Sequence, residues 1–414
     1  MIRTASIGLA IATLFTPSGR AAETDPLDFA AAPHRYHERT PNDPFTRVKA
    51  QLESGALPLD RSSELAAVRS LLKALGIPES SQLLVFSTTS LQLGLISPSN
   101  PRALYFNQDT YIGWVPGGRI EVVSIDPELG GIFYIFDIPH DASPIRADRS
   151  GRCMNCHAGE DAGFVPGLVI KSVLPGPSGG SLESFRDIPA GHATPYTNRF
   201  GGWHVTGADG FSNHWGNLTG RLSQGNLVRI ANPPGDRYRA DRYPVPSSDF
   251  LAHCIHEHQI GFFNRAIAAG YRVRSHLHSD GATLAPAHRR EVDADADALA
   301  RYLLFSDEAP FPVEAVSQAG SYQSDFLRNR RIVNGHSLKD LNLKTRLFQN
   351  RCSYLITSEF FTRLPDPLKS GVVQRIQAAV RDIDPDTRFT SIPAEERRIL
   401  RDLLADALPV FRPK

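Results

Sequence analysis

The feature that most constrains this chain is a series of short β-branched and aromatic runs, followed by a long region of helical periodicity. Turn-forming sequences such as Pro116-Gly117-Gly118 separate the short runs, a pattern typical of β-strands. Connections of only a few residues suit antiparallel neighbours. The sequence therefore predicts an antiparallel meander with strands at 84–87, 103–106, 111–115, 120–125 and 132–136, and a further hairpin that pairs 202–206 with 211–217.

Helical periodicity dominates after a Pro/Gly-rich segment at 232–248. Apolar residues recur there with i, i+3, i+4 spacing, which predicts amphipathic helices. The fold class is therefore α+β. We predict an irregular lead-in at 22–62, an N-terminal antiparallel β-rich domain at 63–245 and a mainly helical C-terminal domain at 246–414. The predicted helices are 64–75, 250–270, 292–304, 368–380 and 394–408.

Residues 1–21 have the pattern of a signal peptide. Arg3 precedes an apolar stretch at 5–15 that is too short to span a bilayer, and Gly19 and Ala21 supply the small residues of a cleavage site. The alternative is an uncleaved amphipathic start. Cleavage implies export to the bacterial periplasm and a mature chain without a transmembrane segment. Removing Arg3 and Arg20 from 45 basic residues leaves 43 against 44 acidic ones, so the charge indicates no nucleic-acid partner.

The motif that carries chemistry is Cys153-Met154-Asn155-Cys156-His157, a C-x-x-C-H sequence. This spacing is the attachment signature of c-type haem. Two thiols three residues apart can each form a thioether with one haem vinyl group, and the next residue presents an imidazole to the iron. The sequence thus predicts one covalent haem c, with Cys153 and Cys156 as the tethers and His157 as the axial ligand.

The cysteine pair has two other possible interpretations. A thioredoxin-type pair should open a helix within a βαβ pattern, whereas Gly-rich sequence follows here. A structural zinc site needs two further ligands in a similar knuckle, and the sequence has no second C-x-x-C. Export agrees with haem, because c-type attachment takes place outside the bacterial inner membrane.

The second axial position of the iron is constrained by the scarcity of methionine. The chain contains only Met1 and Met154. Met1 leaves with the predicted signal peptide, and Met154 lies between the two tethering cysteines, where it should not reach the opposite side of the haem. The iron is therefore expected to be ligated by two His, by His and another donor, or by His157 alone.

His258 is the best candidate for a distal ligand. On a helix it shares an apolar stripe with Leu251, Ile255 and Phe262. A buried imidazole needs a partner, so the alternative is a core histidine satisfied by another polar group.

Four other histidines and two cysteines are further candidates. His253 and His256 are predicted to lie outside the stripe, in solvent, and a metal site built from them and His258 is disfavoured because their spacing does not converge on one helix face. His204 and His214, in the predicted hairpin, could line a haem pocket or be ordinary strand residues. Cys254 and Cys352 could form a disulfide or remain buried free thiols.

Several further segments accompany the motif from about residue 65 onward. They are ALYFNQDTYIGWVPGG, RCMNCHAG with VPGLVIKSV, GGWHVTG with HWGNL, EHQIGFFNRA and LKTRLFQNRCSYLITSEFF. With these segments, the chain resembles a family of exported bacterial monohaem cytochrome c-like proteins of unknown role. The family pattern includes a Glu-His-Gln triplet, here Glu257, His258 and Gln259, and a further His where this chain has Phe262-Phe263. The resemblance implies a haem protein and gives no information about a substrate.

Three functions are compatible with a single covalent haem. The first is a periplasmic cytochrome that transfers electrons to or from a redox partner protein. The second is a haem enzyme acting on peroxide or another small oxidant at an open iron, and the third is a redox or gas sensor. Even without residues 1–21, the 414-residue chain exceeds what a one-haem carrier requires. Peroxide chemistry needs a distal acid or base, and Glu257 should face away from His258 on a helix.

Overall fold

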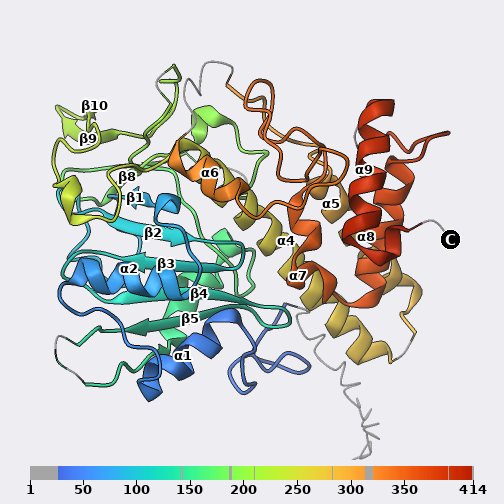
Figure 1. The fold of residues 1–414 in the computed structure, drawn as a ribbon, viewed down its shortest axis with the longest axis horizontal. Helices are drawn as coiled ribbons and strands as arrows, with labels where there is room; N and C mark the ends of the chain where they lie inside the picture. The colour runs from blue at the N-terminus through green and yellow to red at the C-terminus, as the bar shows by residue number, and fades with distance from the viewer. Residues whose placement is uncertain are drawn as a thin grey trace, which may run out of the picture.

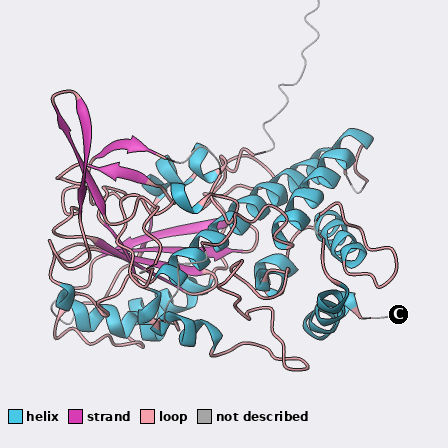
Figure 2. Cartoon of the chain, turned by 90° about the horizontal axis from the view of Figure 1, so that it is seen from above, coloured by secondary structure: helices cyan, strands magenta, loops and turns pink. Residues whose placement is uncertain are grey.

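The computed structural model describes residues 27–139, 141, 143–185, 189–208, 210–281, 283–312, 320–389 and 391–412. The predicted signal peptide at 1–21 lies outside these residues. The strands gather on one side of the molecule and most helices after residue 250 on the other (Figures 1 and 2). The fold is therefore α+β, as the sequence predicts.

A six-stranded antiparallel sheet, with the strands in chain order, forms the β-rich part. Turns of a few residues connect β2 to β5, which fixes the register of these neighbours. Gly113 lies opposite both Leu104 and Glu121, and Glu121 lies opposite Ile135. The strands are β1 (Leu83–Val85), β2 (Arg102–Phe106), β3 (Thr110–Trp114), β4 (Ile120–Asp126), β5 (Gly130–Phe136) and β6 (Asp148–Arg149), and two separate pairs are β7 (Val173–Pro175) with β8 (Ser181–Ser184) and β9 (Leu218–Ser223) with β10 (Asn226–Ala231).

The two faces of the six-stranded sheet pack against different helices. Alternate residues of each strand, such as Ile112 and Trp114 of β3, face a core that includes α1 (Pro44–Ser54) and α2 (Glu64–Ala74). The opposite side, which we call the α4 face, carries Phe106 and Tyr111 and contacts α4 (Phe250–Asp280). The Tyr111 hydroxyl donates to Gln259 Oε1 at 2.9 Å.

The long helix α4 joins the two parts of the molecule. Its N-terminus is capped by Asp249, whose carboxylate accepts the backbone N–H groups of Leu251 and Ala252. One apolar core contains residues of both the sheet and the helices, so packing is continuous across the predicted boundary at 245/246. The other helices are α3 (Met154–His157), α5 (Pro286–Leu303), α6 (Ser321–Leu327), α7 (Glu359–Thr362), α8 (Asp366–Ala379) and α9 (Ala394–Ala407).

Two predictions of local structure were wrong. The lead-in at 22–62 contains α1, which begins after the N-cap Asp43 with proline at its first position. The predicted hairpin at 202–217 is a loop, held by the Asn217 side chain, which bonds to both the N–H and the C=O of Val205. The actual hairpin is β9–β10. Among the described helices, none is long and apolar enough to cross a membrane.

Candidate cofactor-attachment site

The C-x-x-C-H motif directly follows the edge strand β6. The Ser150 N–H donates to the Phe133 carbonyl at 2.8 Å, and a 3₁₀ turn at Gly151–Cys153 then leads into α3. Cys153 is half-buried and Cys156 is exposed, and both are free thiols. Residues three apart in a helical turn lie on one side of it, so the two thiols can bind one group. Met154, which lies between them in sequence, is buried in the core that also contains Phe133 and residues of α1 and α2.

His157 is held in a defined orientation. Its Nδ1 lies 2.9 Å from the Gly167 carbonyl, and the Gly167 N–H donates to the His157 carbonyl at 2.9 Å. Because a carbonyl only accepts, Nδ1 carries the proton and Nε2 keeps its lone pair. Burial lowers the pKa of His157 to about 4, so the ring is neutral at pH 7. A neutral imidazole whose second nitrogen bonds to a carbonyl is the usual state of a metal-ligating histidine.

Helix α4 fixes the loop that holds His157. The Asn264 side chain accepts the Leu168 N–H and donates to the Leu168 carbonyl, both at 2.8 Å. A Cβ at Gly167 would lie 2.6 Å from Asn264 Oδ1, so this close approach requires glycine. Sequence reasoning missed Gly167 and Asn264, since no spacing connects them to the motif. The adjoining Pro166 carbonyl accepts the Gly131 N–H of β5 at 2.7 Å, which anchors the loop to the sheet.

An ion pair lies beside the motif on the α4 face. Arg102 of β2 and Glu121 of β4 approach to 2.5 Å, and both side chains are largely buried. Burial raises the pKa of the Cys153 thiol, with smaller contributions from Glu121, which raises it, and Arg102, which lowers it. These two charges are thus close enough to act on the motif. A thiol with a raised pKa is the opposite of what a thioredoxin-type nucleophile needs.

His258 is buried and fully hydrogen bonded. Its Nδ1 lies 2.9 Å from His192 Nδ1, and its Nε2 lies 2.7 Å from Ser353 Oγ. Burial lowers its pKa to about 3. Both of its bonding partners lie outside the C-x-x-C-H motif. This arrangement matches the alternative of a satisfied core histidine.

The prediction that His253 and His256 lie in solvent was wrong, because α4 is covered on almost all sides. His253 Nε2 lies 2.9 Å from the His204 carbonyl, whereas the His256 ring packs 5.1 Å from that of Phe106. The rings of His253, His256 and His258 therefore contact different partners.

The structure also places the other candidates on α4 and in the loop at 202–217. His204 is fully buried between Phe86 and Tyr238, while His214 Nδ1 accepts the Gly216 N–H. Cys254 and Cys352 are free, and burial raises the pKa of both thiols to about 12. The alternative of two buried free thiols therefore holds, not the disulfide.

No family model, no curated protein and no solved structure matches this chain. Function therefore has to be inferred from the site itself. The donor set fits a c-type haem: two unpaired thiols on one helical turn, and a neutral imidazole whose Nε2 is not the nitrogen bound to Gly167. Cys153 and Cys156 would tether the haem, and His157 would ligate its iron.

Proposed function

We propose that the protein is an exported c-type cytochrome that binds one covalent haem and transfers electrons to or from a partner protein. The observation that carries the proposal is the hydrogen bond from His157 Nδ1 to the Gly167 carbonyl, next to two free thiols at the attachment spacing. When bound, the haem supplies a one-electron iron couple. The chain holds the axial imidazole neutral and oriented through Gly167 and Asn264.

A second candidate is a haem enzyme or sensor with an open iron. The engagement of both His258 nitrogens by His192 and Ser353 favours it, because the most plausible sixth ligand in the sequence is already committed. Against peroxide chemistry, Glu257 is fully buried and lies 3.7 Å from Arg199, in an ion pair rather than in an accessible site.

The central test is the double variant Cys153→Ser/Cys156→Ser, produced in a host competent for c-type maturation. Acid-acetone extraction should remove all haem from this variant and leave it on the wild-type protein. The matched control is Cys254→Ala/Cys352→Ala, which changes the two buried thiols and should keep covalent haem. Covalent haem that survives in the Cys153/Cys156 variant would contradict the proposal.

Absorption spectra of the reduced protein, with and without carbon monoxide, separate the two candidates. Sharp low-spin bands that carbon monoxide does not change would show two strong protein ligands and support an electron carrier. A high-spin spectrum that shifts with carbon monoxide would show an open iron and support the enzyme or sensor. His258→Ala should leave the spectrum unchanged if His258 is a core residue.

A further inference from the structure

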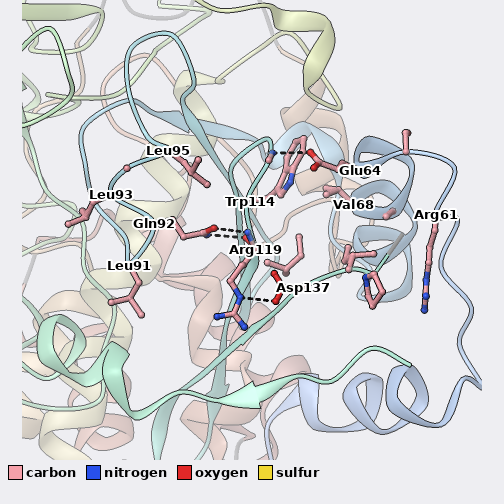
Figure 3. A pocket seen from close by; sticks show the side chains of 18 residues that line it. Arg61, Glu64, Val68, Leu91, Gln92, Leu93, Leu95, Trp114, Arg119 and Asp137 are labelled. Atoms are coloured by element: carbon pink, nitrogen blue, oxygen red, sulfur yellow. Dashed lines mark hydrogen bonds and ion pairs between the residues drawn. The ribbon is translucent and has the colours of Figure 1, made fainter. Parts of the chain in front are cut away.

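A cavity of about 660 Å³ lies on the face of the six-stranded sheet that is opposite to the α4 face (Figure 3). Its walls include Val68 of α2, Trp114 of β3 and Ile120 of β4, which belong to the core that α1 and α2 share with the sheet. Among the described residues that line the cavity, none belongs to the C-x-x-C-H motif. The volume is typical of pockets that hold small molecules. The cavity is therefore a candidate ligand site separate from the attachment motif.

A loop with three exposed leucines forms one wall of this cavity. Leu91, Leu93 and Leu95 are 43%, 57% and 40% exposed, and all three line the cavity. Large apolar side chains that gather at a cavity and stay exposed are typical of a surface that a ligand or partner covers. Because the buried wall behind them is also apolar, the lining favours a ligand with an aliphatic part.

Hydrogen bonds hold this leucine loop in place. Gln92 Oε1 accepts the Arg119 N–H at 2.6 Å, and Gln92 Nε2 donates to the Arg119 carbonyl at 3.1 Å. The Asn100 side chain donates to the Leu95 carbonyl at 2.9 Å. A Cβ at Gly118 would collide with Gln92 Oε1, so the loop approaches the β3–β4 turn this closely only because residue 118 is glycine. A wall that is already ordered loses little conformational entropy when a ligand binds.

Arg119, which directly precedes β4, brings a cation with an unused donor to the cavity. Its Nε is buried and makes no hydrogen bond within the described part of the chain, although Asp137 lies 3.2 Å away in an ion pair. The two side chains are 41% and 71% exposed, so the pair is weak and Arg119 can exchange Asp137 for another carboxylate. A ligand carboxylate would give the buried Nε–H the acceptor that it needs.

Two other charged groups of the lining already have partners. Glu64 Oε2 accepts the Gly117 N–H at 3.0 Å, and Arg61 donates to the carbonyls of Asp141 and Ser143. The unmet needs of the cavity are therefore an acceptor for Arg119 and an apolar cover for the leucines.

We propose that this cavity binds a carboxylate that carries an aliphatic chain, with the chain against Leu91, Leu93 and Leu95 and the carboxylate on Arg119. The planar guanidinium fork of arginine matches a carboxylate in geometry and charge. The inference goes beyond the proposed function, because it uses no residue of the C-x-x-C-H motif and does not require haem.

Isothermal titration calorimetry of the purified protein with octanoate and decanoate tests the aliphatic part. Each buried methylene should strengthen binding roughly four-fold, so decanoate should bind at least about ten-fold more tightly than octanoate. Decyltrimethylammonium has the chain of decanoate with the opposite charge and should bind more weakly. The proposal would be overturned by a lack of decanoate binding, by equal affinities for octanoate and decanoate, or by tighter binding of the cation.

A charge on the apolar wall tests the location. Leu93→Glu should weaken decanoate binding at least about ten-fold, because the new carboxylate repels the ligand and removes apolar contact. The fold should persist, since the Leu93 side chain is more than half exposed. Leu222→Glu, at a position 70% exposed on β9, is the matched control and should leave the affinity unchanged. Unchanged affinity in Leu93→Glu, or equal losses in the two variants, would place the ligand elsewhere and overturn the proposal.

The role of Arg119 is tested with decanoate and the neutral analogue decanol. Arg119→Gln should weaken decanoate binding roughly ten-fold and leave decanol binding unchanged. The bonds to Gln92 use only the Arg119 backbone, so the loop should keep its place. Arg239→Gln is the control, because Arg239 is also exposed and pairs with an exposed acid, Asp241. Unchanged decanoate binding in Arg119→Gln, or an equal loss for decanol, would overturn carboxylate recognition by Arg119.

Discussion

At the scale of single residues, the candidate attachment site depends on a short relay of hydrogen bonds. Asn264 binds the backbone of Leu168 in both directions, and the neighbouring Gly167 carbonyl binds His157. An amide side chain can do this because it has a donor and an acceptor side by side. The orientation of His157 is therefore set by a residue that touches neither the thiols nor the imidazole nitrogen that would bind iron.

Asn264→Ala tests this relay. The change leaves a backbone donor and an acceptor of Leu168 without their partner, so we expect a loss of roughly 1–3 kcal/mol in the free energy of unfolding. Urea denaturation measures it. Asn226→Ala, at an exposed position of β10, is the control and should change stability by less than about 0.5 kcal/mol. Equal stability of both variants would show that the amide does not hold the loop.

The assignment of Cys153, Cys156 and His157 to haem attachment stays a prediction, which the sequence supports because thioether chemistry requires a fixed local spacing. The sequence did not predict Gly167 or Asn264, whose interaction joins segments 96 positions apart. The misplacement of His253 and His256 in solvent has a related cause. Their positions off the apolar stripe indicate exposure only for a helix with one free side, and α4 has neighbours almost all round.

At the scale of elements, strong periodicity gave reliable predictions. All five predicted strands of the meander are present, and so are the five predicted helices, with ends that differ by a few residues in most cases and by ten at the end of α4. The hairpin at 202–217 failed because Gly, Trp and His near a turn resemble strand ends, while side-chain bonds from Asn217 stabilise a loop instead. Such bonds leave no periodic signal.

The N-cap of α4 provides a prediction at this scale. Asp249→Ala removes the acceptor of two N–H groups and should destabilise the protein by about 0.5–2 kcal/mol. Asp249→Asn should retain most of the stability, because asparagine caps as well as aspartate. Thermal unfolding followed by circular dichroism measures both. The role of the cap would be refuted by equal losses in the two variants.

At the scale of the whole molecule, buried neutral histidines make stability depend on pH. Burial lowers the pKa of His204 to about 3 and that of His253 to about 4, below the value of about 6.5 expected in the unfolded chain. Between pH 6.5 and 4 the unfolded chain therefore binds protons that the folded protein does not. Stability should be fully present above about pH 6.5 and fall as the pH decreases through this window.

The size of the effect can be measured by urea unfolding at several pH values. Each such histidine should contribute a slope of up to about 1.4 kcal/mol per pH unit. His204→Phe replaces the imidazole with a ring suited to its position between Phe86 and Tyr238, so it should reduce the slope by up to one proton. An unchanged slope in this variant would assign the pH dependence to other groups.

If the chain carries the proposed haem, the relay from Asn264 to His157 would give the two thioethers and the His157 ligation different fates during unfolding. Thioethers persist in a denatured chain, whereas the imidazole keeps its orientation only while α4 remains docked. In haem-loaded protein, the absorption spectrum of the iron would therefore report whether α4 is docked, although this helix is distant in sequence from the C-x-x-C-H motif. Loss of ligation before the global transition would mark the detachment of that helix as a separate, earlier event.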